Sequence, residues 1–411
     1  MTILKRSQWS ALALSILLVV LVRLSTPVAR PANDGLEYLK VASAGLDPQA
    51  QLAAPFSYRF AVPLMVHGAS VLTGADPLTI FPYVALLSCI ALLTMGYIVA
   101  RLAGAPRGYA LLTMLLMASS LFMIRFPLYF PFAVDVEALV ISFLACVLLL
   151  ERLYVAALIV SLIGMLFKEF LLVPLIVLAG LSFIHYLRDH TTRPLLLTMS
   201  SLLLMSLAFL LPRLLIPVTY SYGTILQVKA ATPNSTMYLS ELRRYIAWPP
   251  EIGTPVNVLL ALVSFWLPVL MLLTPARLRS LWCRLNSNRI LAVVWMGAVV
   301  VLTSVGGTNV MIFVTYTAPI LALAMGLLFR DEVGKWEIAL VLVGTLLFNR
   351  MVFGFGTPGG ELDGPTAFYG AYWHQLNEVT AWRFAEVVGW ILAGWGVRRL
   401  EARMQAHPVA P

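Results

Sequence analysis

The sequence predicts an all-α polytopic membrane protein, a single transmembrane domain over residues 1–411 with about 12 membrane-crossing helices. Three features of its composition predict this class. Sixty per cent of the 411 residues are hydrophobic and only 11% are charged, and the mean hydropathy is +0.89. Because a soluble domain carries about 25% charged residues, this composition excludes a soluble globular protein, a disordered chain and a nucleic-acid reader.

Apolar runs that suit membrane crossing recur along the chain, since a crossing helix needs roughly 17–25 mostly apolar residues. The candidate spans are residues 7–24, 78–100, 108–124, 130–150, 153–167, 170–187, 195–217, 256–274, 290–305, 310–329, 336–353 and 384–397. We interpret the first as an uncleaved span, because no convincing signal-peptide cleavage site follows it. Residues 60–73 are apolar but short, which favours a re-entrant or interfacial helix.

The uneven distribution of charge predicts the orientation. If both termini are cytoplasmic, the cytoplasmic segments hold 16 bases and six acids, and the other side holds 12 bases and 13 acids. Lys and Arg concentrate in the cytoplasmic loops of membrane proteins. Topology therefore accounts for the net charge of +9, and we expect membrane lipids and no nucleic acid as partners.

Three long segments lie on the outer side in this topology, at residues 29–77, 218–255 and 354–383. In the first, Asp34 and Glu37 begin a short amphipathic helix that we expect to lie on the membrane surface. Because they are three residues apart, they should face the same side of that helix. They either cap and favour the helix N-terminus or provide a functional carboxylate.

Three basic residues stand near the outer ends of apolar stretches. Arg59 lies between aromatic residues, Lys168 interrupts a long apolar stretch, and Arg213 lies near the outer end of its span. Each has two interpretations. A long basic side chain can extend to the membrane interface from an apolar segment, or it can bind the phosphate of a lipid.

Two further groups are open to alternative interpretations. Asp135 and Glu137 provide oxygen ligands that suit a divalent cation, or they form a plain polar entrance to a span. Residues two apart do not share a helical face, so a shared metal would need irregular backbone there. Aromatic residues gather at membrane interfaces, but Tyr372, Trp373 and His374 could also bind a sugar beneath a mobile lid.

Several short motifs resemble those of the GT-C superfamily of membrane glycosyltransferases, which use polyprenyl-phosphate-linked sugars. They are Asp34-Gly-Leu-Glu37-Tyr38, Tyr58-Arg59-x-x-x-Pro63-Leu64, Phe167-Lys168-Glu169 and Gly306-Gly307-Thr308-Asn309. The resemblance implies a GT-C-like fold with surface helices in the first outer loop, and a bacterial inner-membrane location. The commonest family form has two adjacent acids in this loop. Here two residues separate them, so which acid is catalytic stays open.

The first functional hypothesis is an inverting glycosyltransferase that moves a sugar from a polyprenyl-phosphate donor to an acceptor on the extracytoplasmic face. Asp34, with Glu37 as the fallback, takes the acceptor proton, and Arg59, Lys168 and Arg213 hold the phosphate charge. No cofactor is required, and a divalent cation is an option. The alternatives are a secondary transporter or flippase and a non-catalytic lipid-binding scaffold. The first hypothesis expects Asp34, Arg59 and Lys168 to converge.

Overall fold

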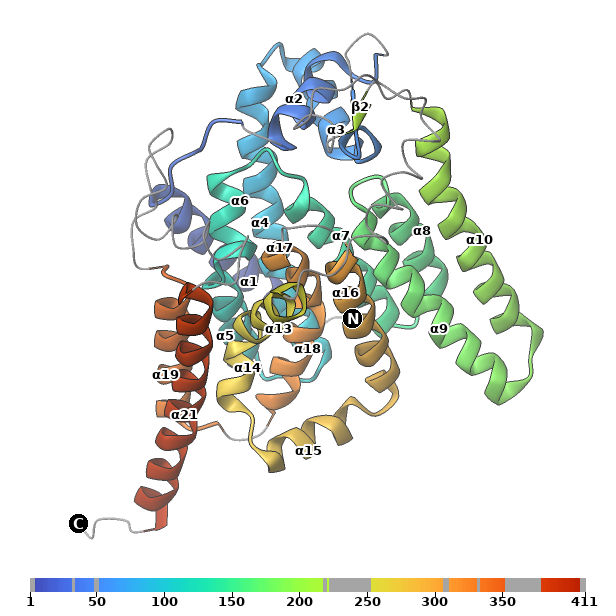
Figure 1. The fold of residues 1–411 in the computed structure, drawn as a ribbon. Coiled ribbons are helices and arrows are strands. Elements are labelled where there is room, and N and C mark those ends of the chain that lie inside the picture. Colours follow the sequence, from blue (N-terminus) through green and yellow to red (C-terminus); the bar gives the residue numbers. More distant parts are fainter. Residues whose placement is uncertain are drawn as a thin grey trace.

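The structure is a computed structural model that describes residues 4–31, 34–47, 52–216, 220–221, 253–305, 310–330, 333–351 and 378–406. The described chain is almost entirely helical (Figure 1). Its helices are α1 (Leu4–Leu24), α2 (Asp34–Ala44), α3 (Ala61–Thr73), α4 (Pro77–Leu102), α5 (Arg107–Ala118), α6 (Phe126–Tyr129), α7 (Asp135–Leu150), α8 (Tyr154–Gly164), α9 (Leu172–Asp189), α10 (Thr192–Leu215), α13 (Gly253–Phe265), α14 (Leu267–Leu272), α15 (Pro275–Leu285), α16 (Arg289–Val305), α17 (Val310–Val314), α18 (Ala318–Leu328), α19 (Lys335–Phe348) and α21 (Glu378–Ala406). Two short strands, β1 (Ala53–Ala54) and β2 (Tyr220–Ser221), pair in parallel.

Four helical stretches of the described chain are long and apolar enough to cross a membrane: α4, Glu169–Asp189, α10 and Val310–Leu328. Two bent helix pairs raise this number to as many as six. The all-α class and several apolar helices of crossing length are therefore found. The count of about 12 spans stays a prediction.

The predicted span at 108–124 is bent rather than straight. α5 ends at Ala118, and the chain turns by 73° into the segment Leu121–Tyr129. The first part of this segment, Leu121–Arg125, is π-helical, and Pro127 follows within α6. A π-helical turn and a proline both interrupt the regular hydrogen-bond ladder that keeps a helix straight.

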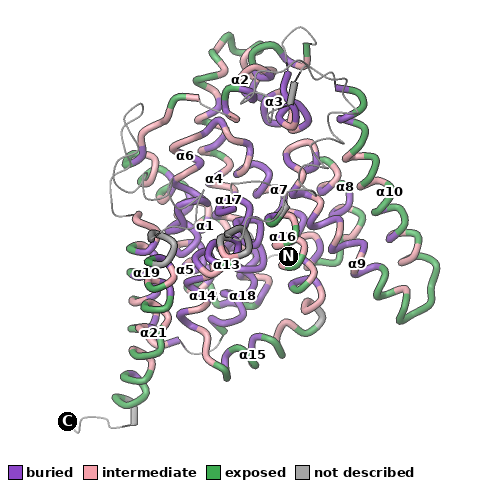
Figure 2. Tube along the Cα trace, in the orientation of Figure 1, coloured by how far each residue is buried: buried purple, intermediate pink, exposed green. Residues whose placement is uncertain are grey.

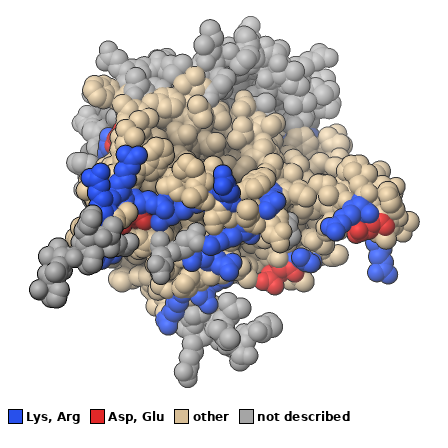
Figure 3. All heavy atoms as spheres, turned by 90° about the horizontal axis from the view of Figure 1, so that it is seen from below, with Lys and Arg blue, Asp and Glu red and all other residues tan. Residues whose placement is uncertain are grey.

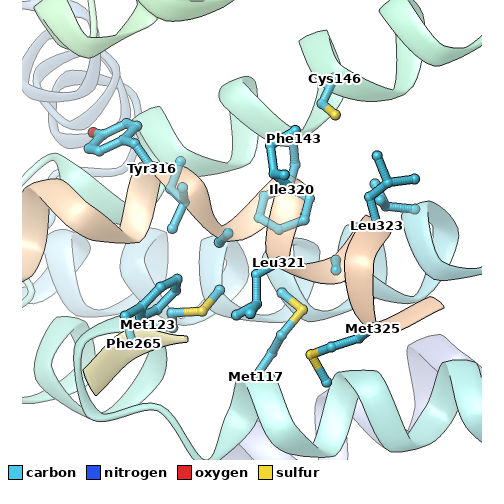
Figure 4. Packing of buried hydrophobic residues seen from close by; sticks show 14 of the residues in the cluster. Met117, Met123, Phe143, Cys146, Phe265, Tyr316, Ile320, Leu321, Leu323 and Met325 are labelled. Carbon is cyan, nitrogen blue, oxygen red and sulfur yellow. The ribbon is translucent and has the colours of Figure 1, made fainter. Parts of the chain in front are cut away.

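α18 forms the centre of the bundle. All of its residues are buried, as expected for a helix that is apolar on every side. Figure 4 shows Ile320 and Leu321 of this helix among side chains that include Phe143 and Met117. A Cβ added at Gly326 would lie 2.8 Å from the carbonyl oxygen of Ala100, so α18 packs directly on the α4 backbone. By contrast, α10 is exposed along most of its length (Figure 2).

Helices α2 and α3 lie together over one end of the bundle (Figure 1). A small apolar core beneath α2, which includes Tyr38, Phe56 and Phe132, holds them there. His67 of α3 bonds through Nδ1 to the carbonyl oxygen of Ala42, at 2.9 Å. This packing fixes α2 as a surface helix whose inner side faces the bundle.

The opposite end of the molecule carries α15 and the end of α21 (Figure 1). Lys and Arg side chains gather on this face and far outnumber the acidic ones (Figure 3). One arginine is instead buried: Arg277 of α15 pairs with Glu337 of α19 through nitrogen–oxygen distances of 2.9 and 3.1 Å. The pair ties two helices together at the basic end.

Candidate functional site

Two arginines from distant parts of the chain share one carboxylate below α2. Glu169, in the 3₁₀ turn that leads into α9, accepts from Arg59 Nε through Oε2 at 2.7 Å. Its Oε1 accepts from Arg213 Nη2 at 3.1 Å. The three side chains are between 7% and 19% exposed. Charge-assisted hydrogen bonds in such a site are stronger than neutral ones, so this Arg59–Glu169–Arg213 bridge holds both guanidinium groups in place.

Local structure brings the two arginines together. Arg213 lies in the last turn of α10, where its Nη1 donates to the carbonyl oxygen of Phe209 at 2.7 Å. Its guanidinium lies over the ring of Phe209, at 3.7 Å, and 4.9 Å from the ring centre of Tyr58. Ala53 of β1 pairs with Tyr220 of β2, which places the chain after α10 beside the chain that leads to Arg59.

A second ion pair lies next to this bridge. Lys168, immediately before Glu169, donates to the carboxylate of Asp135 at the start of α7. The side chain of Lys168 is 5% exposed and that of Asp135 is 20% exposed. The Lys168 ammonium also lies 5.1 Å from the ring centre of Phe313. Lys168 has extended backbone and Glu169 begins the 3₁₀ turn, and the two side chains serve different partners.

Asp34, the first residue of α2, lies near both ion-pair groups. Burial raises the pKa of the Asp34 carboxyl, while the positive charges of Arg59 and Lys168 oppose that rise and the charge of Asp135 adds to it. Asp34 is therefore within electrostatic reach of all three. Of the predicted site residues, Arg59 and Lys168 thus lie within electrostatic reach of Asp34, and Arg213 is joined to Arg59 through Glu169.

Two buried tyrosines complete this cluster. The hydroxyl oxygen of Tyr38, one helical turn after Asp34, accepts from Arg59 Nη1 at 3.2 Å. Burial also raises the pKa of Tyr38. Tyr316 donates to the main-chain oxygen of Asp135 at 3.5 Å, and its ring stacks on Phe170. Sequence reasoning did not select either tyrosine or Glu169 as a site residue.

Of these three residues, the sequence contains a pattern that could have indicated Tyr38 and Glu169 but none that could have indicated Tyr316. Tyr38 is four residues from Asp34, a spacing that puts both on one helical face. Glu169 adjoins Lys168, which was already a candidate. Tyr316 lies in an apolar stretch with no pattern that distinguishes it from a core residue.

Glu37 lies elsewhere on α2. Its carboxylate pairs with Lys40 at 2.9 Å. Both residues border an outer depression of about 480 Å³, together with Leu36, Leu39, Ser43 and Ala44. Three residues along a helix leave side chains roughly 60° apart, and this difference is enough to give Asp34 and Glu37 different surroundings.

The structure places the carboxylates of Asp135 and Glu137 in different surroundings. Asp135 pairs with Lys168, whereas Glu137 is 6% exposed and lies against Ser88 of α4. Glu137 Oε2 has no hydrogen-bond partner among the described residues. Within the same residues, no group of three or more His, Cys, Asp or Glu side chains could hold a metal ion.

The remaining candidates lie outside the described residues. These are Tyr372, Trp373 and His374 of the last outer segment, and the Gly306–Asn309 motif.

Comparisons with known proteins do not extend this assignment. No family matches the chain, and no curated protein or solved structure is significantly similar to it. The proposed function therefore rests on the cluster itself.

Proposed function

We propose that the protein is an inverting glycosyltransferase that transfers a sugar from a polyprenyl-phosphate carrier to an acceptor, within a GT-C-like fold of about 12 spans. The observation that carries the proposal is a cluster at one end of an apolar helical bundle. In it Arg59 donates to Tyr38 of α2, and Asp34 of the same helix lies within electrostatic reach of Arg59 and Lys168. Ionisable groups are costly in such surroundings and mark functional sites.

The charges of the cluster suit phosphate as a leaving group. The Arg59–Glu169–Arg213 bridge contains two positive charges and one negative charge, and so provides a net positive half. Asp34, Asp135 and Lys168 form a net negative half. In this proposal the donor phosphate binds to the net positive group, and its sugar carbon faces Asp34. The negative charge that develops on the phosphate then meets the arginines, and the proton that leaves the acceptor meets a carboxylate.

The proposed reaction is a single displacement at the anomeric carbon. The acceptor oxygen forms a bond to this carbon as the bond to the donor phosphate oxygen breaks, and that phosphate keeps the electron pair. Asp34 takes the acceptor hydroxyl proton as general base. Arg59 and Arg213 stabilise the negative charge that develops on the phosphate. Polyprenyl phosphate then leaves, and no metal or cofactor step is needed in this scheme.

The sidedness of the molecule supports a reaction outside the cytoplasm. The end that carries α15 is rich in Lys and Arg (Figure 3), which is typical of a cytoplasmic face. α2, which begins at Asp34, lies at the other end (Figure 1). The proposed location is a bacterial inner membrane, with cytoplasmic termini and an outward-facing site.

The direct test is sugar transfer by the purified protein from a panel of polyprenyl-phosphate sugars. We expect Asp34→Asn to abolish transfer, because an amide cannot accept the acceptor proton. Glu37→Gln removes the other acid of the same helix and is the matched comparison. Undiminished transfer by Asp34→Asn would exclude Asp34 as the base, and loss only in Glu37→Gln would move that role to Glu37.

One observation favours the alternative of a secondary transporter or flippase. Glu137 is a buried carboxyl between α7 and α4, and its Oε2 has no hydrogen-bond partner among the described residues. Such groups mark ion or proton paths in transporters. Uptake into liposomes that is abolished by Glu137→Gln and unaffected by Asp34→Asn would support this alternative.

A further inference from the structure

Glu169 is the least expected member of the cluster, because a carboxylate stands where an anion would bind. Each of its oxygens accepts from a different arginine, at 2.7 Å from Arg59 Nε and 3.1 Å from Arg213 Nη2. Without this carboxylate, two guanidinium groups would repel one another in a largely buried site. Glu169 therefore both aligns the two cations and cancels one of their charges.

We propose that Glu169 sets the charge selectivity of the phosphate site, so that it binds a singly charged phosphodiester and releases a doubly charged phosphomonoester. This inference rests on the proposed function, and it deepens that function by naming the donor class. A lipid monophosphate sugar is a phosphodiester with one negative charge. A lipid diphosphate sugar carries at least two and is expected to be a poor donor.

The charges around the bridge support this selectivity. Arg59, Glu169 and Arg213 together carry one net positive charge, which one phosphodiester charge balances. Asp34 is within electrostatic reach of Arg59, and Asp135 is within electrostatic reach of Asp34. Lys168 is already engaged by Asp135. A second negative charge on the ligand therefore meets two carboxylates rather than an additional cation.

The same arrangement explains how the product would leave. When the bond between the sugar carbon and the phosphate oxygen breaks, the phosphate changes from a diester to a monoester. A phosphomonoester carries about −1.5 to −2 charges at pH 7. Glu169 repels the additional charge and so favours release of the lipid phosphate after transfer.

The chain contains a second cluster with the same composition, which provides a matched control. Glu386 pairs with Arg350 at 2.6 Å and with Arg383 at 2.8 Å. Both arginines also donate to main-chain oxygens near the end of α19, including that of Phe348. This second cluster closes a helix C-terminus, where cations are favourable. It is not linked to Asp34 by any described interaction.

The experiment compares the affinities of the full-length protein in nanodiscs for farnesyl phosphate and for its methyl diester. Tryptophan fluorescence provides both dissociation constants, at pH 8 and at pH 5. We expect Glu169→Gln to strengthen binding of the monoester relative to the diester by at least about tenfold at pH 8. The effect should disappear at pH 5, where the monoester is singly charged because its second pKa is about 6.

Further variants distinguish selectivity from loss of structure. Glu169→Asp keeps the charge and should restore the wild-type affinity ratio. Arg213→Gln should shift the ratio in the opposite direction, toward the diester. Glu386→Gln also breaks an Arg–Glu–Arg cluster and should leave the ratio unchanged.

The failures of the two proposals are distinguishable. If the wild-type protein binds neither farnesyl compound, the proposed phosphate site is wrong. If it binds both, and Glu169→Gln and Arg213→Gln leave their affinity ratio unchanged at pH 8, the charge-selectivity inference is wrong while the phosphate site stands.

Discussion

Glu169 Oε2 lies 2.7 Å from Arg59 Nε, although 110 residues separate them in the sequence. The contact joins the segment that leads from α2 into α3 to the turn between α8 and α9. It also fixes Arg59 for its second hydrogen bond, to the hydroxyl of Tyr38. The surface helix that carries Asp34 is therefore tied to the bundle by a polar contact at the centre of the site.

Replacing Arg59 should reduce transfer strongly. We expect Arg59→Gln to lower kcat/KM by about 10²–10³, the usual effect of removing one donor that stabilises a developing anion. Arg59→Lys should be intermediate, because one ammonium cannot reproduce the planar fork that contacts Glu169 and Tyr38. Steady-state kinetics measures both. Lys40→Gln removes a cation from the outer side of α2, and an equal loss there would contradict a specific role for Arg59.

The stability of the folded protein should depend on the protonation of Asp34. Because burial raises the pKa of Asp34 in the folded protein, the folded state binds this proton more tightly than the unfolded chain does. Between the unfolded value of about 3.9 and the raised folded value, stability falls as pH rises, and the loss persists at higher pH. Asp34→Asn should therefore be at least as heat-stable as wild type at pH 7.

Thermal unfolding at pH 7 and pH 4 measures this effect, and the advantage of Asp34→Asn should shrink at the lower pH. Transfer by the wild type should decrease as Asp34 becomes protonated. A clearly less stable Asp34→Asn protein at pH 7 would show that the ionised carboxylate makes net favourable contacts.

The close approach of α2 to the bundle should depend on Gly35. A Cβ at this position would lie 2.8 Å from Phe130 Cζ and 2.9 Å from Phe132 Cβ. We expect Gly35→Ala to lower the free energy of unfolding by about 1–3 kcal/mol and to reduce transfer by displacing Asp34. Gly68→Ala in α3 is the control, because its Cβ would meet nothing within 4 Å. Equal effects of the two substitutions, measured by unfolding in detergent, would contradict this explanation.

The buried Arg277–Glu337 pair should matter for stability rather than for chemistry. The two side chains are 7% and 4% exposed, so removing one partner leaves a buried charge without its counterion. We expect Arg277→Gln to cost about 3–5 kcal/mol, measured by unfolding in detergent. Arg279→Gln, an exposed position on the same helix, should cost little. Kinetic constants of the folded fraction should be unchanged in both, because the pair lies at the end opposite the Asp34 cluster.

Much of the general architecture can be predicted from residue order alone, because hydropathy is a local property. Long apolar runs predicted the helices α4, α9, α10 and α18. The few ionisable residues in the first outer segment and near the outer ends of apolar stretches identified Asp34, Arg59, Lys168 and Arg213 as candidates. Burying a charge is costly, so a charge in an apolar stretch is informative without any structure.

Which side chains pair with one another, and which way they face, depends on packing between distant segments. No local pattern indicates that Glu169 joins two arginines, that Lys168 binds Asp135, or that Tyr316 reaches the same cluster. Likewise, Asp34 and Glu37 have the spacing of neighbours on a helix, yet the placement of α2 over the bundle puts the first near Arg59 and Lys168 and pairs the second with Lys40. The sequence identifies which side chains are costly to bury, and the tertiary contacts decide which of them share a site.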